Sequence, residues 1–321
     1  MNKLAAISAF LGNVKNRYIE YHPNNSIIDK IELASKIERM DGLELCYPAD
    51  FTEIPVSELR KRMSDAGLGI AAVNIRTRRT GKWWRGSFSS AIAEERQELV
   101  DEFRKAMDMA SEVGTQRVST CPLNEGHDYV FEMDYFDAYK DSEEAFAKIC
   151  EHNRQMQVCI EYKWNDPRQR CLLGGAAEVA LFCQNVSADN LGATLDIGHS
   201  IQANERPAQA AALLHRANRL FYVHLNDNDR YWDWDMLPGS VNFWDTIEFL
   251  YYIKSCGYTD DWIAYDVMAK EVDFEKHFNL VTKLTRKLES LADKLDRDRV
   301  RQLLNKRNPN DSIEYLFDTL L

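Results

Sequence analysis

Four ionisable residues in the second half of the chain stand at the ends of short apolar runs, each one strand–helix repeat from the next. They are Glu161, Asp196, His224 and Asp266. Three carboxylates and an imidazole within a few ångströms of one another need neutralising, because an unpaired buried charge is costly. A divalent cation is the usual neutraliser, so the spacing predicts a metal site. For any one of these acids alone, a solvated strand end or a helix cap is the alternative.

A second group of candidate metal ligands lies beside the first. His199 follows Asp196 by three residues. Asp233 and Asp235 form an Asp-x-Asp pattern in the segment after His224, although such a segment alone is more typical of an exposed acidic loop. These residues could hold a second cation, with Asp196 shared between the sites. Oxygen-rich ligation with one imidazole per site suits Mn²⁺, Mg²⁺ or Co²⁺ better than structural zinc. We expect one or two ions per chain, with Mn²⁺ as the first choice.

Lys163 places a cation close to the first group. Glu161 and Lys163 are two residues apart, so on an extended strand end their side chains point the same way. A lysine near substrate oxygens can polarise a carbonyl or hold a developing alkoxide, whereas an ion pair with Glu161 is the alternative role. We assign Glu161, Lys163 and Asp266 as the candidate catalytic residues.

The elements that position these residues are predicted from hydropathy. Eight β-type runs recur, at residues 4–10, 42–46, 69–75, 116–120, 156–161, 191–196, 220–225 and 261–266. Several are almost continuously apolar, as in parallel strands covered on both faces, and most precede an amphipathic helical pattern. This pattern predicts an α/β protein with a (β/α)8 TIM-barrel fold, whose strand ends converge on one active face. A doubly wound open sheet is the alternative, but no G-x-G-x-x-G or P-loop motif accompanies it.

The composition changes after the eighth run, where residues 271–306 are charged and helical in pattern. Only the first part of this segment is needed to close a barrel. We therefore expect a barrel domain over residues 1–285 and a helical C-terminal extension over residues 286–321, rather than two domains. The surplus helices suit an arm on a neighbouring subunit.

Charge and hydropathy exclude several classes of partner. The 321 residues include 51 acids and 40 bases, a net charge of −11, which argues against nucleic acid or an anionic membrane as the main partner. No run approaches the roughly 20 apolar residues that cross a bilayer. The N-terminal apolar run lacks a clean signal-peptide cleavage site and suits a first strand. Seven cysteines without a CxxC pair favour a reducing, cytoplasmic setting.

These motifs resemble the xylose isomerase-like barrel superfamily, and most closely the two-metal aldose isomerases for xylose and rhamnose. The segment EYKWNDPR at 161–168 is similar to the family's E-x-K-P-x-E-P-R motif. The patterns at 196–199 and 233–235 resemble the ligands of the second metal, with Asp196 bridging the two ions. Asp266 stands where the last ligand of the first site is expected. His224 is closer to the rhamnose-isomerase and ketose-epimerase branches.

Two further loops extend the resemblance and supply candidate substrate contacts. Asn124-Glu125-Gly126 is similar to an R-E-G turn after strand four, and GKWWRGSF at 81–88 to the loop after strand three. Tryptophans of such loops can stack on the apolar face of a sugar. The candidate substrate-binding residues are Trp83, Glu125, His199 and Trp232.

The resemblance implies a divalent-metal-dependent sugar isomerase that interconverts an aldose and a ketose by hydride shift. The substrate would be a small sugar or sugar acid, and the protein a homo-oligomer, either a dimer or a tetramer. The alternative is a ketose 3-epimerase, which needs one metal and moves a proton through an enediolate. That branch usually has Glu on strand eight, where this chain has Asp266. Apurinic endonucleases share the barrel but need more histidines and a basic groove.

One departure from the family concerns ring opening. Xylose isomerases carry a histidine after strand two, whereas this chain has CYPAD, with Tyr47 and Asp50. The substrate is therefore expected to be acyclic, a sugar acid, or opened in another way. Arg76, Arg78 and Arg79 after strand three could favour a carboxylate- or phosphate-bearing substrate, or could be solvated loop charges.

Overall fold

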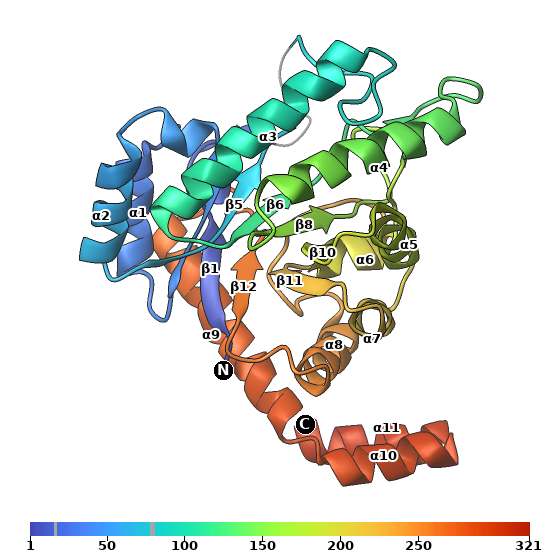
Figure 1. The fold of residues 1–321 in the computed structure, drawn as a ribbon. Coiled ribbons are helices and arrows are strands. Elements are labelled where there is room, and N and C mark those ends of the chain that lie inside the picture. The colour runs from blue at the N-terminus through green and yellow to red at the C-terminus, as the bar shows by residue number, and fades with distance from the viewer. Residues whose placement is uncertain (16–17, 78–80) are drawn as a thin grey trace.

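The computed structural model describes residues 1–15, 18–77 and 81–321, so Arg78 and Arg79 lie outside the described residues. Eight parallel strands close into a barrel (Figure 1). In barrel order they are β1 (Lys3–Ile7), β4 (Gly42–Tyr47), β5 (Gly69–Ile75), β6 (Arg117–Thr120), β8 (Gln157–Glu161), β10 (Leu191–Asp196), β11 (Leu220–Leu225) and β12 (Trp262–Tyr265). β12 pairs with β1 and closes the ring. Each predicted run supplies one strand, and the TIM barrel is confirmed.

Helices surround the barrel and bury their apolar faces on it (Figure 1). They are α1 (Ile27–Lys36), α2 (Val56–Asp65), α3 (Ala93–Val113), α4 (Tyr135–His152), α5 (Ala176–Val186), α7 (Pro207–Arg216), α8 (Phe243–Ser255) and α9 (Phe274–Asp293). Local sequence fixes several starts, because Ser26 and Asp29 form a capping box on α1, and Asp134 and Asp273 cap α4 and α9. None of the described helices is both long enough and apolar enough to cross a membrane.

Short elements decorate the loops that follow the strands. They are the 3-10 turns η1 (Ser8–Leu11) and η2 (Ala49–Phe51), the short helix α6 (Ile197–Gln202), and the antiparallel pairs β2 (Val14–Lys15) with β3 (Glu20–Tyr21) and β7 (Gly126–His127) with β9 (Arg170–Cys171). The pair β7–β9 joins the loops after β6 and β8. Loops after different strands are thereby held against one another, which gives the cavity described below fixed walls.

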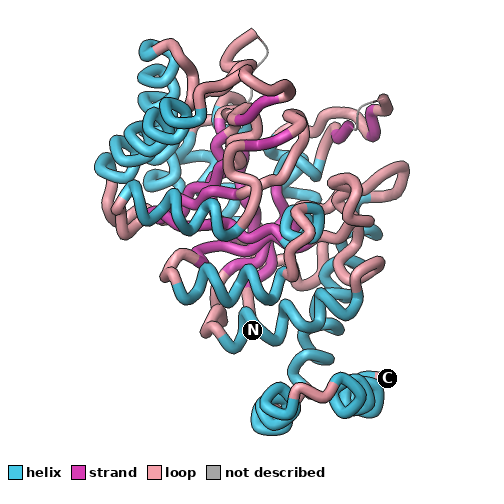
Figure 2. The backbone as a smooth tube through the Cα atoms, turned by 90° about the vertical axis from the view of Figure 1, so that its right-hand side faces the viewer, coloured by secondary structure: helices cyan, strands magenta, loops and turns pink. Residues whose placement is uncertain are grey.

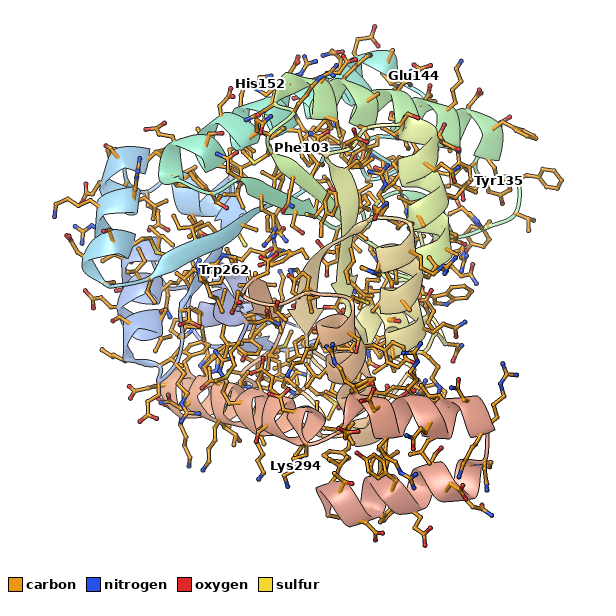
Figure 3. The ribbon with its side chains drawn as sticks, turned by 60° about the horizontal axis from the view of Figure 1, so that its bottom comes forward. Phe103, Tyr135, Glu144, His152, Trp262 and Lys294 are labelled. Carbon is orange, nitrogen blue, oxygen red and sulfur yellow. The ribbon has the colours of Figure 1, made fainter. Side chains whose placement is uncertain are left out.

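The C-terminal part of the chain, where an extension over residues 286–321 was expected, is helical. The expected boundary at 285/286 falls inside α9, which continues to Asp293 because its buried face reaches Leu291 and Ala292. Beyond Lys294, α10 (Arg297–Lys306) and α11 (Pro309–Leu320) lie side by side and project from the barrel (Figures 1, 2 and 3). Phe317 of α11 packs on Trp244 of α8, with ring centroids 5.4 Å apart.

Candidate metal centre

The four residues of the first predicted ligand group meet at the C-terminal ends of four consecutive strands. Glu161 ends β8, Asp196 ends β10, His224 lies in β11 and Asp266 directly follows β12. One ligand atom from each of the four lies within 4.8 Å of the others. The parallel register explains this convergence, since Asp196 stands opposite His224 and Thr194 opposite Glu161. These strand ends therefore act as one four-residue cluster.

The cluster has the donors and the charge that a divalent cation needs. Oδ1 of Asp266 is buried without a hydrogen-bond partner among the described residues. Burial and the charges of Glu161 and Asp196 raise the pKa of Asp266 well above its ordinary value. Although burial opposes the effect, the imidazoles of His224 and His199 lower the pKa of Glu161 to about 2. A divalent cation would relieve the repulsion between these carboxylates, so the residues present fit such an ion.

Asp196 is positioned by the helix that follows it. As the N-cap of α6, its Oδ1 accepts a hydrogen bond of 2.8 Å from the His199 backbone N–H. Its Oδ2 accepts one of 3.1 Å from Asn226, whose own oxygen takes the Gly198 N–H at 2.8 Å. A Cβ on Gly198 would come within 2.5 Å of that oxygen, so a glycine is required there. The Asp-Ile-Gly-His sequence thus sets both the ligand and the helix start.

Sequence analysis missed Glu44, which holds the imidazole of His224. Glu44 lies in β4 and is fully buried. Its carboxylate faces Nε2 of His224 at 3.0 Å, and it also accepts hydrogen bonds from Tyr222 at 2.7 Å and Asn74 at 2.9 Å. Because a carboxylate can only accept, Nε2 donates, and Nδ1 is left to face the cluster, where Glu161 lies at 3.3 Å. A carboxylate behind a ligating histidine fixes its tautomer and raises its basicity. An acid inside an otherwise apolar strand run was the available signal.

The second predicted ligand group is brought together in part. His199 Nε2 lies 3.1 Å from Asp233 Oδ2, and Lys163 Nζ lies 2.8 Å from the same oxygen. Lys163 also pairs with Asp166 at 3.2 Å, so among the described residues its carboxylate partners are Asp233 and Asp166 rather than Glu161. Burial, together with the charges of Asp233 and Asp266, raises the pKa of Asp235 well above its ordinary value. The charge of Asp233 is balanced by the ammonium group of Lys163.

A cysteine also faces this part of the centre. Cys121 follows β6, and its sulfur lies within 4.8 Å of ligand atoms of Glu161 and His199. Cys121 was not among the predicted ligands, because a lone cysteine outside a CxxC pattern gives no metal signal.

The imidazole of His199 lies among carboxylates. Although burial opposes the effect, the charges of Asp196 and Asp233 raise the pKa of His199 to about 10.

A cavity of about 850 Å³ opens onto the centre. Glu161 and Asp266 line it, whereas Asp196 and His224 are fully buried and do not reach its surface. Other lining side chains include Trp84, Trp232, Trp234, Lys163, His199, Asp233, Asp235, Asn74, Arg76 and Asn124. The cavity thus combines a carboxylate-rich wall with indole surfaces that suit a polyhydroxylated ligand.

Two predicted substrate-binding residues lie elsewhere. Trp83 is only 2% exposed, packs in the hydrophobic core and does not line the cavity. The backbone of Trp83 has a positive φ of 53°, and the next residue, Trp84, lies on the cavity wall. Arg168 donates a hydrogen bond to the Trp84 carbonyl. Trp232 does line the cavity, as expected from the sequence.

Glu125 is an anchor for a neighbouring loop. It is buried and accepts hydrogen bonds from the backbone N–H groups of Ser87, Phe88 and Ser89, at 2.7, 2.8 and 2.9 Å, and from both serine hydroxyls. Both carboxylate oxygens of Glu125 are thus hydrogen-bonded to the 84–90 loop, which Glu125 fixes, and Glu125 is not among the residues that line the cavity.

The sequence profile of the xylose isomerase-like TIM barrel family matches residues 31–269. The chain belongs to this family. Among solved structures, L-ribulose 3-epimerase superposes with a TM-score of 0.71 and 19% identity, covering 95% of this chain and 98% of its own. A D-tagatose 3-epimerase-like protein gives 0.70 and 18%, covering 90% and 98%. The IOLI protein with a bound zinc atom gives 0.69 and 15%, covering 90% and 98%. No curated protein sequence matches this member of the family significantly.

Proposed function

We propose that this xylose isomerase-like barrel is a divalent-metal-dependent ketose 3-epimerase. The observation that carries the proposal is the cluster of Glu161, Asp196, His224 and Asp266, of which only Glu161 and Asp266 face the cavity. The sequence analysis placed an aldose–ketose isomerase first and the epimerase second. The names of the similar solved structures support the reverse order, because several are sugar 3-epimerases and one holds zinc.

The barrel order gives Glu161 and Asp266 complementary positions. β8 and β12 stand on either side of the neighbouring pair β10 and β11, so the two carboxylates approach a bound sugar from two sides. One carboxylate removes the proton from the carbon beside the carbonyl, giving an enediolate. The other returns a proton to the opposite face of that carbon, which inverts it. Asp266 has an oxygen without a protein partner among the described residues and is available for this transfer.

The remaining residues of the centre bind and orient. Asp196, His224 and the two facing carboxylates would hold a divalent ion, which when bound polarises the substrate carbonyl and the adjacent hydroxyl. Lys163 lies on the same wall and can donate to a substrate oxygen, since its ammonium has three protons and two carboxylate partners. Trp84 and Trp232 exclude water from the faces of the sugar.

Metal removal tests the proposal directly. A sample stripped with a chelator should lose turnover of ketoses, and restoring Mn²⁺, Co²⁺ or Mg²⁺ should recover it. A panel of ketoses, aldoses and aldonates assayed by chromatography identifies the product, and calorimetry measures ion binding independently of turnover. A protein with which no metal co-purifies and into which none can be titrated would contradict the proposal.

An aldose–ketose isomerase is the second candidate, and one observation favours it. His199, Asp233 and Lys163 form a contiguous charged group beside the four-residue cluster, and Asp235 lines the same cavity. If a second ion displaced Lys163 from Asp233, these side chains could hold it and Lys163 would be released toward the substrate. A hydride shift between two adjacent carbons would then replace proton transfer.

Isotope transfer separates the two candidates. In D₂O, an epimerase is expected to place solvent deuterium on the inverted carbon, because the carboxylate that returns the proton exchanges with solvent. An isomerase working by hydride shift should instead keep a deuterium from C2 of an aldose on C1 of the ketose. Proton and deuterium NMR of the products measures both results. Proton transfer would be contradicted if the product kept the hydrogen of the substrate and took up no deuterium from D₂O.

A further inference from the structure

Arg76 is a cation on the cavity wall that the proposed chemistry does not use. It directly follows β5 and lines the same cavity as Glu161 and Asp266. Its guanidinium carries five N–H donors and stays charged at any physiological pH. Among the described residues, the side-chain partner recorded for it is the sulfur of Cys46, 3.9 Å away. A thiol is a weak acceptor, so the described residues leave most of the donor capacity of Arg76 unused.

The other cations that line the cavity have oxygen partners. Lys163 pairs with Asp233 at 2.8 Å, and Lys270 donates to the Trp234 carbonyl at 2.9 Å. Lys82 pairs with Glu98, and Lys15 lies 3.8 Å from Glu20. Within the described part of the wall, Arg76 is therefore the cation without an oxygen partner.

Neutralising the metal centre does not account for this arrangement. The charges of Asp266 and Glu161 act on Arg76, but no carboxylate of the described residues comes within the 4.0 Å that defines an ion pair. Had its role been to neutralise these acids, Arg76 would contact them as Lys163 contacts Asp233. Instead Arg76 and the two carboxylates line the same cavity without pairing, so a substrate group that enters the cavity can meet the guanidinium.

We propose that Arg76 binds a carboxylate of the substrate, so that the protein acts on sugar acids in preference to neutral sugars. The inference rests on the proposed function, which supplies the orientation of the carbonyl end at the metal centre. A guanidinium matches a carboxylate through two parallel hydrogen bonds. Among the described residues of the wall, Arg76 is the one cation without an oxygen partner, which suits a monoanion better than a phosphate dianion, because the lysines there are already paired.

Paired ligands that differ in the carboxylate alone test the assignment. Calorimetry on the metal-loaded protein would compare a hexonate with the matching hexitol, on wild type, R76M, R76K and R216M. Arg216 is an exposed arginine at the end of α7 that does not line the cavity, so R216M is the matched control. R76M is expected to weaken hexonate binding about 10- to 100-fold, the range for a charged hydrogen bond. Hexitol binding should change less than about threefold, and R76K should recover part of the loss, because its charge remains.

The assignment of Arg76 would be overturned if R76M weakened hexonate and hexitol binding equally, or if it weakened neither. It would also be overturned if the wild type did not bind the hexonate more tightly than the hexitol. If R76M weakens the binding of a hexose phosphate more than that of the hexonate, the carboxylate assignment is overturned in favour of a phosphate group. If the hexonate binds through Arg76 but no ketose or keto acid is epimerised, the proposed function fails while the assignment of Arg76 stands.

Discussion

Replacing Asp196 with asparagine should abolish metal binding at micromolar concentrations and lower turnover at least about 100-fold, since even outer partners of a metal site contribute about 10- to 100-fold. The substitution removes one of three carboxylate charges from the four-residue cluster. The fold should survive, because asparagine is also a good N-cap and can accept from the His199 N–H in the same way. We expect a loss of about 1 kcal/mol in stability, as the new amide meets the amide of Asn226.

The control for this variant is D189N. Asp189 is an exposed residue in the turn just before β10, so the same chemical change there should leave metal affinity and turnover unchanged. Calorimetric titration with Mn²⁺ gives the affinity, steady-state assays give the turnover, and denaturant unfolding gives the stability. Full turnover in D196N would contradict the assignment of Asp196 to the metal centre.

Replacing Glu44 with glutamine is expected to weaken metal binding about 10- to 100-fold, although Glu44 lies outside the four-residue cluster. The neutral amide no longer favours a proton on Nε2 of His224, so the lone pair of Nδ1 is no longer directed at the cluster. The amide in E44Q has one acceptor oxygen. Turned toward Asn74, it keeps that hydrogen bond and presents its NH2 group to the Tyr222 hydroxyl, which can accept, and to Nε2 of His224, so the structural effect is smaller than that of E44A. In E44A, three buried donors lose their acceptor, and we expect a further loss of stability of several kcal/mol.

Nitrogen NMR of the histidine rings separates positioning from mere destabilisation. Wild type should show His224 as the Nε2–H tautomer when metal is bound, whereas E44Q should show a mixture or weaker occupancy. E38Q, which alters an exposed glutamate, is the matched control and should behave as wild type. An unchanged tautomer and an unchanged affinity in E44Q would show that Glu44 does not position the ligand.

Much of the fold could be predicted from local sequence. Eight apolar runs, most of them followed by an amphipathic helical pattern, favour a barrel, since parallel strands buried on both faces must be covered by helices and no nucleotide-binding motif of an open sheet is present. The boundary of the extension was harder to place, because the amphipathic pattern of α9 continues without interruption across 285/286. The charge composition changes near residue 285, but the buried face of α9 continues to Leu291 and Ala292. The buried face, not the charge, decides where a packed helix ends.

The positions of loop residues were harder to predict than those of strand-end residues. Neighbouring residues of a strand point to opposite faces, so strand-end positions such as Asp196 follow from the period alone. Loop residues have no such period. Trp83 and Trp84 are neighbours of the same type, and only the tertiary structure shows that Trp83 packs in the core while Trp84 lines the cavity. Glu125 was expected at the substrate, but its carboxylate is taken up by the backbone of the 84–90 loop.

The sequence by itself determined which ionisable residues stand at strand ends, and hence that Glu161, Asp196, His224 and Asp266 converge once the barrel closes. The tertiary structure alone decided which partner each group meets. Glu44 reaches His224 across 180 residues of chain, and Lys163 meets Asp233 rather than Glu161. The physical reason is that backbone periodicity fixes the face and level of a side chain, whereas its partners depend on barrel closure and loop conformation, which bring distant segments together.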